Sequence, residues 1–252
     1  FQAYRNNAAA NGTAVQYNHP QYGPGPNPRF PDYLYADGAS GVVGSVDMAK
    51  IQADYERDPL NTFLFLLNLQ GTNWYKEITH VASLNRISLN FNGGTEAGRF
   101  FIGLGAHSQD GVTIGNSFTR YTVRANSEWD LRPWLAIGEN FQATYRSAKG
   151  IEGANGGIGV ADEESTLLSA FRMPTIIPVK DEFGSYASTK AAGFNNPRNP
   201  VRVLDYDRGN DTNFNINLFG NMYLLLKPID GLTIRSSLGM QYNNYYYTDY
   251  NY

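Results

Sequence analysis

Side-chain character alternates with a period of two over long segments of this chain. Between Leu232 and Tyr246 the even positions are mostly apolar and the odd positions are almost all polar. This alternation predicts a β-strand with one apolar and one polar face, because successive side chains of a strand point to opposite sides. Strands of small soluble sheets seldom keep it beyond about ten residues.

Five further segments repeat this design. The expected strands occupy six ranges, about 81–92, 98–109, 118–129, 134–147, 213–227 and 231–247. No stretch approaches the roughly 20 apolar residues that a membrane-spanning helix needs, whereas a barrel strand needs only half of its residues to be apolar. The chain is therefore predicted to be all-β, and specifically part of an antiparallel up-and-down transmembrane β-barrel.

The connections between the expected strands alternate in length. Tight turns are expected within Asn92–Gly98, Asp130–Trp134 and Lys227–Gly231, at Gly93-Gly94, Arg132-Pro133 and Pro228. Longer links join the other strand ends, over about residues 109–118 and over the long loop 148–212. In outer-membrane barrels the short turns face the periplasm and the long loops face outside. We expect that orientation here.

Residues 1–80 lack the alternation and are expected to form an extracellular loop region with short helices. A first helix is expected within Phe1–Ala10. Helical spacing predicts a second over Val46–Arg57. Asp58 then offers an N-cap, followed by a proline at the first position of a third helix over Pro59–Leu69.

Aromatic residues gather near both ends of the expected strands. Tyr and Trp favour the two interfaces of a bilayer, where the ring lies at the acyl boundary and the polar tip reaches the headgroups. The residues expected to form these two membrane girdles are Phe91, Phe100, Trp129, Trp134, Tyr242 and Tyr246.

The polar faces of the strands are the expected ligand-binding surface. If the strands line a barrel, these side chains face a hydrated lumen that contacts solute; otherwise they form only the wet face of an antiparallel sheet. No single residue can be identified as a ligand. The candidates expected to face the lumen are Arg120, Arg124, Arg235, Gln241 and Asn243.

Composition excludes several other functions. The chain has no cysteine, so thiolate metal sites and cysteine nucleophiles are absent. A net charge of -3 provides no basic field for nucleic acid. His19, His80 and His107 are too scattered for a metal site. The acidic run 162–164, together with Asp181 and Glu182, is interpreted as part of a solvated loop. We therefore expect no metal, no cofactor and no catalytic residues.

Several short motifs resemble a known family. Gly71–Ile78 (GTNWYKEI), followed by a strand ending in Asn92–Glu96 (NGGTE), resembles the corresponding stretch of SusC-like TonB-dependent transporters. Further segments follow in the order of the family and cover nearly all of the chain from Gly71. They are Gly105–Gly111, Phe118–Tyr121, Arg124–Asn126, Ile137–Asn140, Arg172–Pro174, Ile177–Val179, Asn199–Val201, Phe219–Asn221 and Gly231–Thr233.

The resemblance implies a barrel of about 22 strands, plugged by an N-terminal domain and energised by the TonB complex. It implies an outer-membrane location in a Gram-negative, Bacteroidetes-like cell. It also implies a SusD-like lipoprotein that captures glycan oligosaccharides or peptides. Glu139 interrupts an apolar face, but the family pattern tolerates it near the periplasmic rim, where a lipid-side charge costs little.

The chain lacks an initiator Met, a plug and a TonB box, so it is expected to be an excerpt from the N-terminal part of the barrel. Two alternatives remain open: a secreted soluble β-sandwich that binds carbohydrate through aromatic platforms, and a passive porin or adhesin barrel. The barrel hypothesis requires Ile234, Leu238 and Met240 to face lipid, opposite Arg235 and its neighbours on the polar face.

Overall fold

The computed structural model describes residues 18–19, 23–24, 29–35, 40–41, 45–59, 62–150, 166–189, 194, 197–207 and 212–248. The chain divides into two compact units. The sheet unit comprises residues 79–152 and 206–252, and the loop unit comprises residues 1–78 and 153–205. The N-terminal region and most of the later long loop, which the sequence separates, thus belong to one unit.

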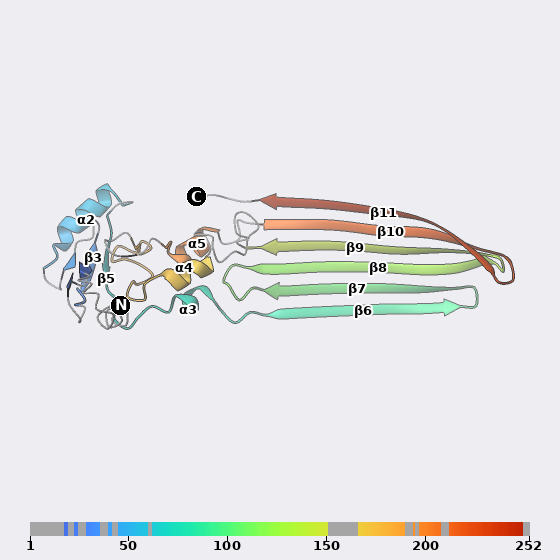
Figure 1. Ribbon diagram of the computed structural model, residues 1–252, viewed down its shortest axis with the longest axis horizontal. Helices are drawn as coiled ribbons and strands as arrows, with labels where there is room; N and C mark the ends of the chain where they lie inside the picture. The colour runs from blue at the N-terminus through green and yellow to red at the C-terminus, as the bar shows by residue number, and fades with distance from the viewer. Residues whose placement is uncertain are drawn as a thin grey trace, which may run out of the picture. The chain divides into compact units, whose positions relative to one another are not determined.

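The sheet unit contains a six-stranded antiparallel sheet in which each strand pairs with its sequence neighbours (Figure 1). This is the predicted up-and-down order. With about 3.4 Å per residue, strands of 12 to 18 residues exceed the thickness of a bilayer core, which is about 30 Å. The strands are β6 (Leu84–Thr95), β7 (Gly98–Asp110), β8 (Ser117–Arg132), β9 (Leu135–Lys149), β10 (Thr212–Ile229) and β11 (Leu232–Thr248).

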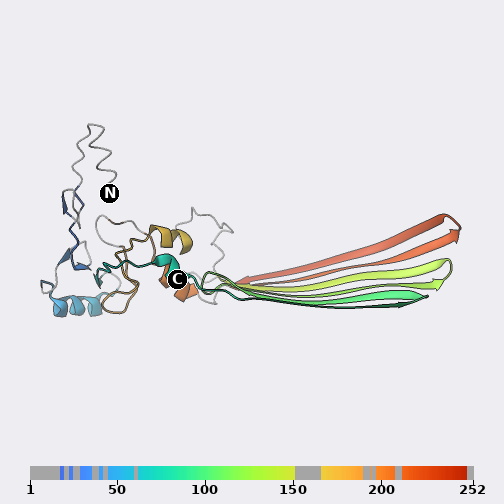
Figure 2. The same cartoon turned by 90° about the horizontal axis from the view of Figure 1, so that it is seen from below.

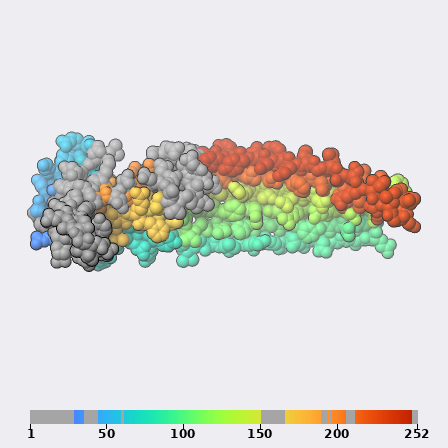
Figure 3. All heavy atoms as spheres, in the orientation of Figure 1, coloured from blue at the N-terminus to red at the C-terminus, as the bar shows by residue number. Residues whose placement is uncertain are grey.

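The sheet is twisted and open. Figure 2 shows it nearly edge-on where the long connections leave it, and fanned out toward the tight turns. The space-filling view in Figure 3 shows its side chains as a continuous layer, with β11 in red along one edge. The strands β6 and β11 are the two edges, so the described strands do not close into a barrel.

Three tight turns join the strands in pairs, each within its predicted range but one to three residues after the residues expected to form it. Arg132 is the last residue of β8, and Pro228 lies within β10 at a shift of register between Leu226 and Ile229. Proline is tolerated at such a bulge, so it marks the irregularity and not the turn. The residues in the turns are Glu96-Ala97, Pro133-Trp134 and Asp230-Gly231.

The expected turn at Gly93-Gly94 is wrong. Both glycines belong to β6, and Gly93 is the direct partner of Phe100 on β7. A Cβ atom at Gly93 would lie 2.9 Å from the Phe100 ring. Glycine is therefore required here for the close approach of an aromatic ring across the ladder, and not for a reversal of the chain.

The loop unit combines a small sheet with short helices. None of the helices in the described parts of the chain is both long and apolar enough to cross a membrane. This unit also contains a hairpin, formed by β1 (Asn18–His19) and β2 (Gly23–Pro24). Its small sheet is formed by β3 (Tyr33–Tyr35), β4 (Ser40–Gly41) and β5 (Leu64–Leu66). The helices are α2 (Met48–Arg57), α3 (Trp74–Ile78), α4 (Thr166–Arg172) and α5 (Pro200–Asp207).

The region before β6 differs from its prediction in one helix. Asp58 ends α2 instead of starting a helix, and the segment expected to be helical over Pro59–Leu69 contains β5. Tertiary pairing overrides the local signal, because β5 pairs with β3 and buries Leu64 and Phe65 completely. The helix expected within Phe1–Ala10 lies outside the described residues.

Three of the family-like motifs pack together in the loop unit: Gly71–Ile78, Arg172–Pro174 and Ile177–Val179. The Trp74 indole N–H donates to the Pro174 carbonyl oxygen at 3.0 Å. The Thr72 hydroxyl donates to the Ile177 carbonyl oxygen at 2.7 Å, and the Thr72 amide donates to the Thr175 carbonyl oxygen. One apolar core surrounds these bonds, formed by Leu34, Phe63, Phe65, Leu67, Trp74, Met173, Ile177 and Ala187.

Candidate functional site

The register of the sheet sorts side chains into rows on two faces. On the polar face, one row of consecutive partners across β6 to β10 is Arg86, His107, Arg120, Arg146 and Asn215. The next row on this face, continued to β11, is Ser88, Gly105, Thr122, Thr144, Asn217 and Asn243. A row on the apolar face is Leu89, Leu104, Val123, Ala143, Leu218 and Tyr242.

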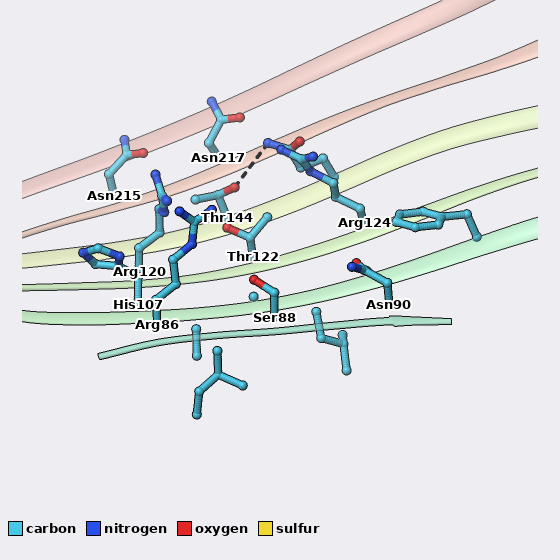
Figure 4. Close-up of a pocket in the computed structure, with 17 residues that line it drawn as sticks. Arg86, Ser88, Asn90, His107, Arg120, Thr122, Arg124, Thr144, Asn215 and Asn217 are labelled. Carbon is cyan, nitrogen blue, oxygen red and sulfur yellow. Dashed lines mark hydrogen bonds between the residues drawn. The ribbon is translucent and has the colours of Figure 1, made fainter. Parts of the chain in front are cut away.

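A groove of about 500 Å³ runs across these rows on the polar face. Figure 4 shows the labelled side chains standing on one side of the strands, with Arg86, Arg120 and Arg124 among the amides and hydroxyls. Gly105 lies on the groove floor, where the missing side chain leaves space, whereas the place of a Cβ at Gly103 lies 3.0 Å from the Phe101 ring. The arrangement can donate many hydrogen bonds, because each guanidinium carries five N–H groups and no acceptor.

The five candidates expected to face the lumen all occupy the polar face, but they do not form one site. Arg120 and Arg124 line the groove. Asn243 pairs with Asn217 and accepts a hydrogen bond from the side chain of Asn215. Gln241 lies in the next row of this face toward the tight turns, and Arg235 lies closer still to those turns.

Sequence reasoning missed two arginines of this face. Arg86 and Arg146 share the row of Arg120. Arg86 and Arg146 alternate with Ile87 and Tyr145, so the sequence pattern already placed both arginines on a polar face. A local pattern does not contain the register between strands, because pairing between distant segments sets the register.

A second polar cluster lies on the same face near the tight turns. Arg99 forms an ion pair with Glu128 at 2.9 Å, and the Tyr223 hydroxyl donates to the other Glu128 oxygen at 2.8 Å. The Arg235 guanidinium stacks over the Tyr223 ring, 4.0 Å from its centroid. At this end of the sheet, charge is compensated within the sheet itself.

The apolar face presents large side chains that remain exposed. Leu238 and Met240 are 80% and 77% exposed, and they lie on the face opposite Arg235 and Gln241. A ladder of stacked rings crosses β8 to β11 toward the long-connection end. Its members are Tyr121, Tyr145, Phe214 and Tyr246, with centroids 5.1 to 6.4 Å apart.

The predicted girdle residues take three kinds of position. Phe91, Phe100 and Trp129 stand on the apolar face near the tight turns, and Trp134 lies in the β8–β9 turn itself. Tyr246 belongs to the aromatic ladder at the other end. Tyr242 lies on the same face as Tyr246, four residues closer to the tight turns. The assignment of these residues to two bilayer interfaces stays a prediction.

Glu139 stands on the apolar face with a local partner. The Ser127 hydroxyl lies 2.6 Å from both oxygens of its carboxylate, and the Trp129 indole donates to the same hydroxyl at 2.9 Å. Hydrogen bonds lower the cost of a charge among apolar neighbours. Within the described residues, no three His, Asp or Glu side chains converge on a metal-binding position.

The fold and its faces define the class: a twisted antiparallel sheet of the outer-membrane barrel type, two-faced and longer than a bilayer is thick. Solved structures agree. The chain resembles the RagAB peptide importer in its closed-closed and open-open states, each with a TM-score of 0.53 and 20% identity. The match covers 69% of this chain and 19% of the solved chain, and at this identity it establishes the fold alone.

Curated relatives add similarity in sequence. The chain is 29% identical to TonB-dependent receptor P39 of Formosa agariphila over 64% of its length, and 25% identical to TonB-dependent receptor P3 over 69%. It spans only 14% and 17% of those proteins. No protein-family model matches the chain. These likenesses confirm the predicted resemblance to SusC-like TonB-dependent transporters.

Proposed function

We propose that this chain forms part of the barrel wall of a TonB-dependent outer-membrane transporter that imports oligosaccharides or peptides. The observation that carries the proposal is the division of the sheet into an exposed apolar face and a grooved polar face, along strands of membrane-spanning length. The apolar face meets lipid, and the polar face, with Arg120, Arg124, Arg235, Gln241 and Asn243, lines the hydrated lumen.

The orientation follows from the connections. The tight turns face the periplasm, and the loop unit, with residues 1–80 and most of the loop 148–212, lies outside. There it meets a SusD-like lipoprotein that captures the solute, while the TonB complex supplies the energy. The likeness to the RagAB peptide importer favours such a partnership, and the Formosa relatives favour a Bacteroidetes-like Gram-negative cell. Catalysis has no part in this function.

Uptake in the native cell tests the proposal. The full-length protein should fractionate with the outer membrane, and uptake of fluorescent oligosaccharides or peptides should stop when TonB is deleted. A SusD-like lipoprotein should co-purify with it in mild detergent. Extraction without detergent would instead support the soluble β-sandwich, and uptake that persists without TonB would support a passive porin.

A further inference from the structure

The row that contains Arg86, Arg120 and Arg146 concentrates positive charge in the half of the sheet near the long connections. Arg120 and Arg146 are direct partners across β8 and β9. Like charges placed opposite each other in a ladder repel. A chain selected only for stability would avoid this pairing, so an anion is expected to offset it.

No carboxylate of the sheet supplies that anion. The groove is lined by three arginines and a histidine, and by neither Asp nor Glu among the described residues. The ion pair described within the sheet, Arg99–Glu128, lies at the opposite end. Among the described residues, an ion pair therefore compensates charge near the tight turns, whereas no carboxylate lines the groove near the long connections.

The rest of the groove suits hydroxyl groups. Amide and hydroxyl side chains both donate and accept hydrogen bonds, as sugar hydroxyls do. Asn217, Thr122 and Thr144 line the groove between the arginines. The large apolar side chains that line the groove are Ile87, Phe101 and Leu104, and most of its other lining side chains are polar. Gly105 keeps the floor low, and a Cβ there would approach nothing closer than Thr122, at 3.8 Å.

We propose that the groove binds an acidic oligosaccharide, a chain of sugars that carries carboxylate or sulfate groups. The guanidinium groups of Arg86, Arg120 and Arg124 bind the anionic groups in fork-like pairs, and the amide and hydroxyl side chains bind the sugar hydroxyls. This inference rests on the proposed function, because it gives the chemistry of the solute that the barrel imports.

The test is binding to the purified full-length transporter by isothermal titration. The probes are a galacturonate hexasaccharide, a sulfated hexasaccharide, a neutral glucose hexasaccharide and a glutamate-rich peptide. At least one acidic sugar should bind about tenfold or more tightly than the neutral one, and its affinity should fall as salt rises. Arg120→Gln should weaken that binding by about tenfold, since one charge-assisted contact is lost.

Two variants distinguish binding in the groove from a general effect of the protein's charge on affinity. Gly105→Val fills the floor while leaving every arginine in place, and it should weaken the acidic sugars at unchanged net charge. Arg132→Gln removes an exposed charge at the β8–β9 turn, outside the groove, and it should leave the affinity as in the wild type.

Three results overturn the inference while leaving the proposed function intact. They are equal affinity for neutral and acidic sugars, tighter binding of the acidic peptide than of either acidic sugar, and unchanged sugar affinity in Arg120→Gln together with reduced thermal stability. The last result would mean that another part of the protein occupies the groove. If no oligomer binds and TonB-dependent uptake is also absent, both proposals fail.

Discussion

Three aromatic rings of the sheet each lie over a glycine directly across the ladder. The pairs are Gly93 with Phe100, Gly98 with Trp129, and Gly138 with Tyr223. A Cβ atom at Gly98 or Gly138 would lie 2.3 or 2.2 Å from the partner ring. Such rings cover the exposed backbone of glycine and recover packing that glycine otherwise loses in a strand.

Gly138→Ala should therefore be destabilising, although alanine has the better intrinsic propensity. The added methyl forces the Tyr223 ring away and disturbs its hydrogen bond to Glu128, which should cost about 1–3 kcal/mol. The measurement is the free energy of unfolding of the full-length protein in urea and detergent micelles. Gly220→Ala is the control, because its Cβ finds only an ordinary contact at 3.6 Å. Equal stability of the two variants would contradict the packing argument.

In the loop unit, one carboxyl group should make stability depend on pH. The prediction of a solvated position is wrong for Asp181, which is 7% exposed because one of its oxygens accepts from the amides of Phe183 and Ser185 at 3.0 and 2.8 Å inside the loop unit. Burial raises the pKa of this carboxyl, against the opposing effect of the two amides. Between the ordinary pKa, which is about 3.9, and the raised pKa, the folded state binds more protons than the unfolded state. The free energy of unfolding should therefore fall as pH rises from the ordinary pKa through the raised pKa.

Asp181→Asn tests this dependence, because an amide oxygen can still accept from both backbone groups. The stability of the variant relative to the wild type should increase as pH rises from about 3 to about 7, measured by thermal unfolding at each pH. Glu77→Gln, at an exposed position of α3, should show no comparable trend. A constant difference between Asp181→Asn and the wild type across the range would refute the assignment.

Among the elements, the strands and the ranges of the turns were predictable, whereas the exact turn residues and one helix were not. Alternation is a local property, and it predicted six strands in up-and-down order. Glycine is ambiguous, because Gly93 looks like a turn residue and in fact makes room for a ring. The segment after Asp58 has helical signals, yet pairing with β3 makes part of it a strand. The polar face was predictable for the same local reason, whereas the arginine row depends on register between strands up to about 60 residues apart.

The packing of α3 on the chain before Val179 gives a prediction for the loop unit. Trp74 is 2% exposed within the core and bonded to Pro174. Trp74→Ala should cost about 3–5 kcal/mol through the cavity it leaves, and Trp74→Phe less, since most of the packing remains. Limited proteolysis of the loop unit should report the loss, with Lys76→Ala as the exposed control. Protease resistance of Trp74→Ala equal to that of the wild type would contradict this packing.

At the scale of the whole molecule, the sheet is stable only if something covers its apolar face. Isolated sheets do not leave residues such as Leu238 and Met240 almost fully exposed. The aromatic ladder on that face, from Tyr121 to Tyr246, fits an interface between lipid tails and headgroups. Lipid would cover the apolar face, while water and solute would occupy the polar one.

The division into a lipid-facing and a wet face predicts that an added arginine destabilises one face of β11 and is tolerated on the other. Leu238→Arg places a charge toward lipid, seven residues into a strand of 17, and should cost about 2–4 kcal/mol near the bilayer midplane. Gln241→Arg adds the same side chain to the wet face and should fold almost as well as the wild type. The measurement is the folded fraction of the full-length protein in lipid vesicles, read from its heat-dependent mobility on gels. Equal yields for the two variants, or a larger loss for Gln241→Arg, would exclude a lipid-facing apolar surface and return the soluble sandwich to consideration.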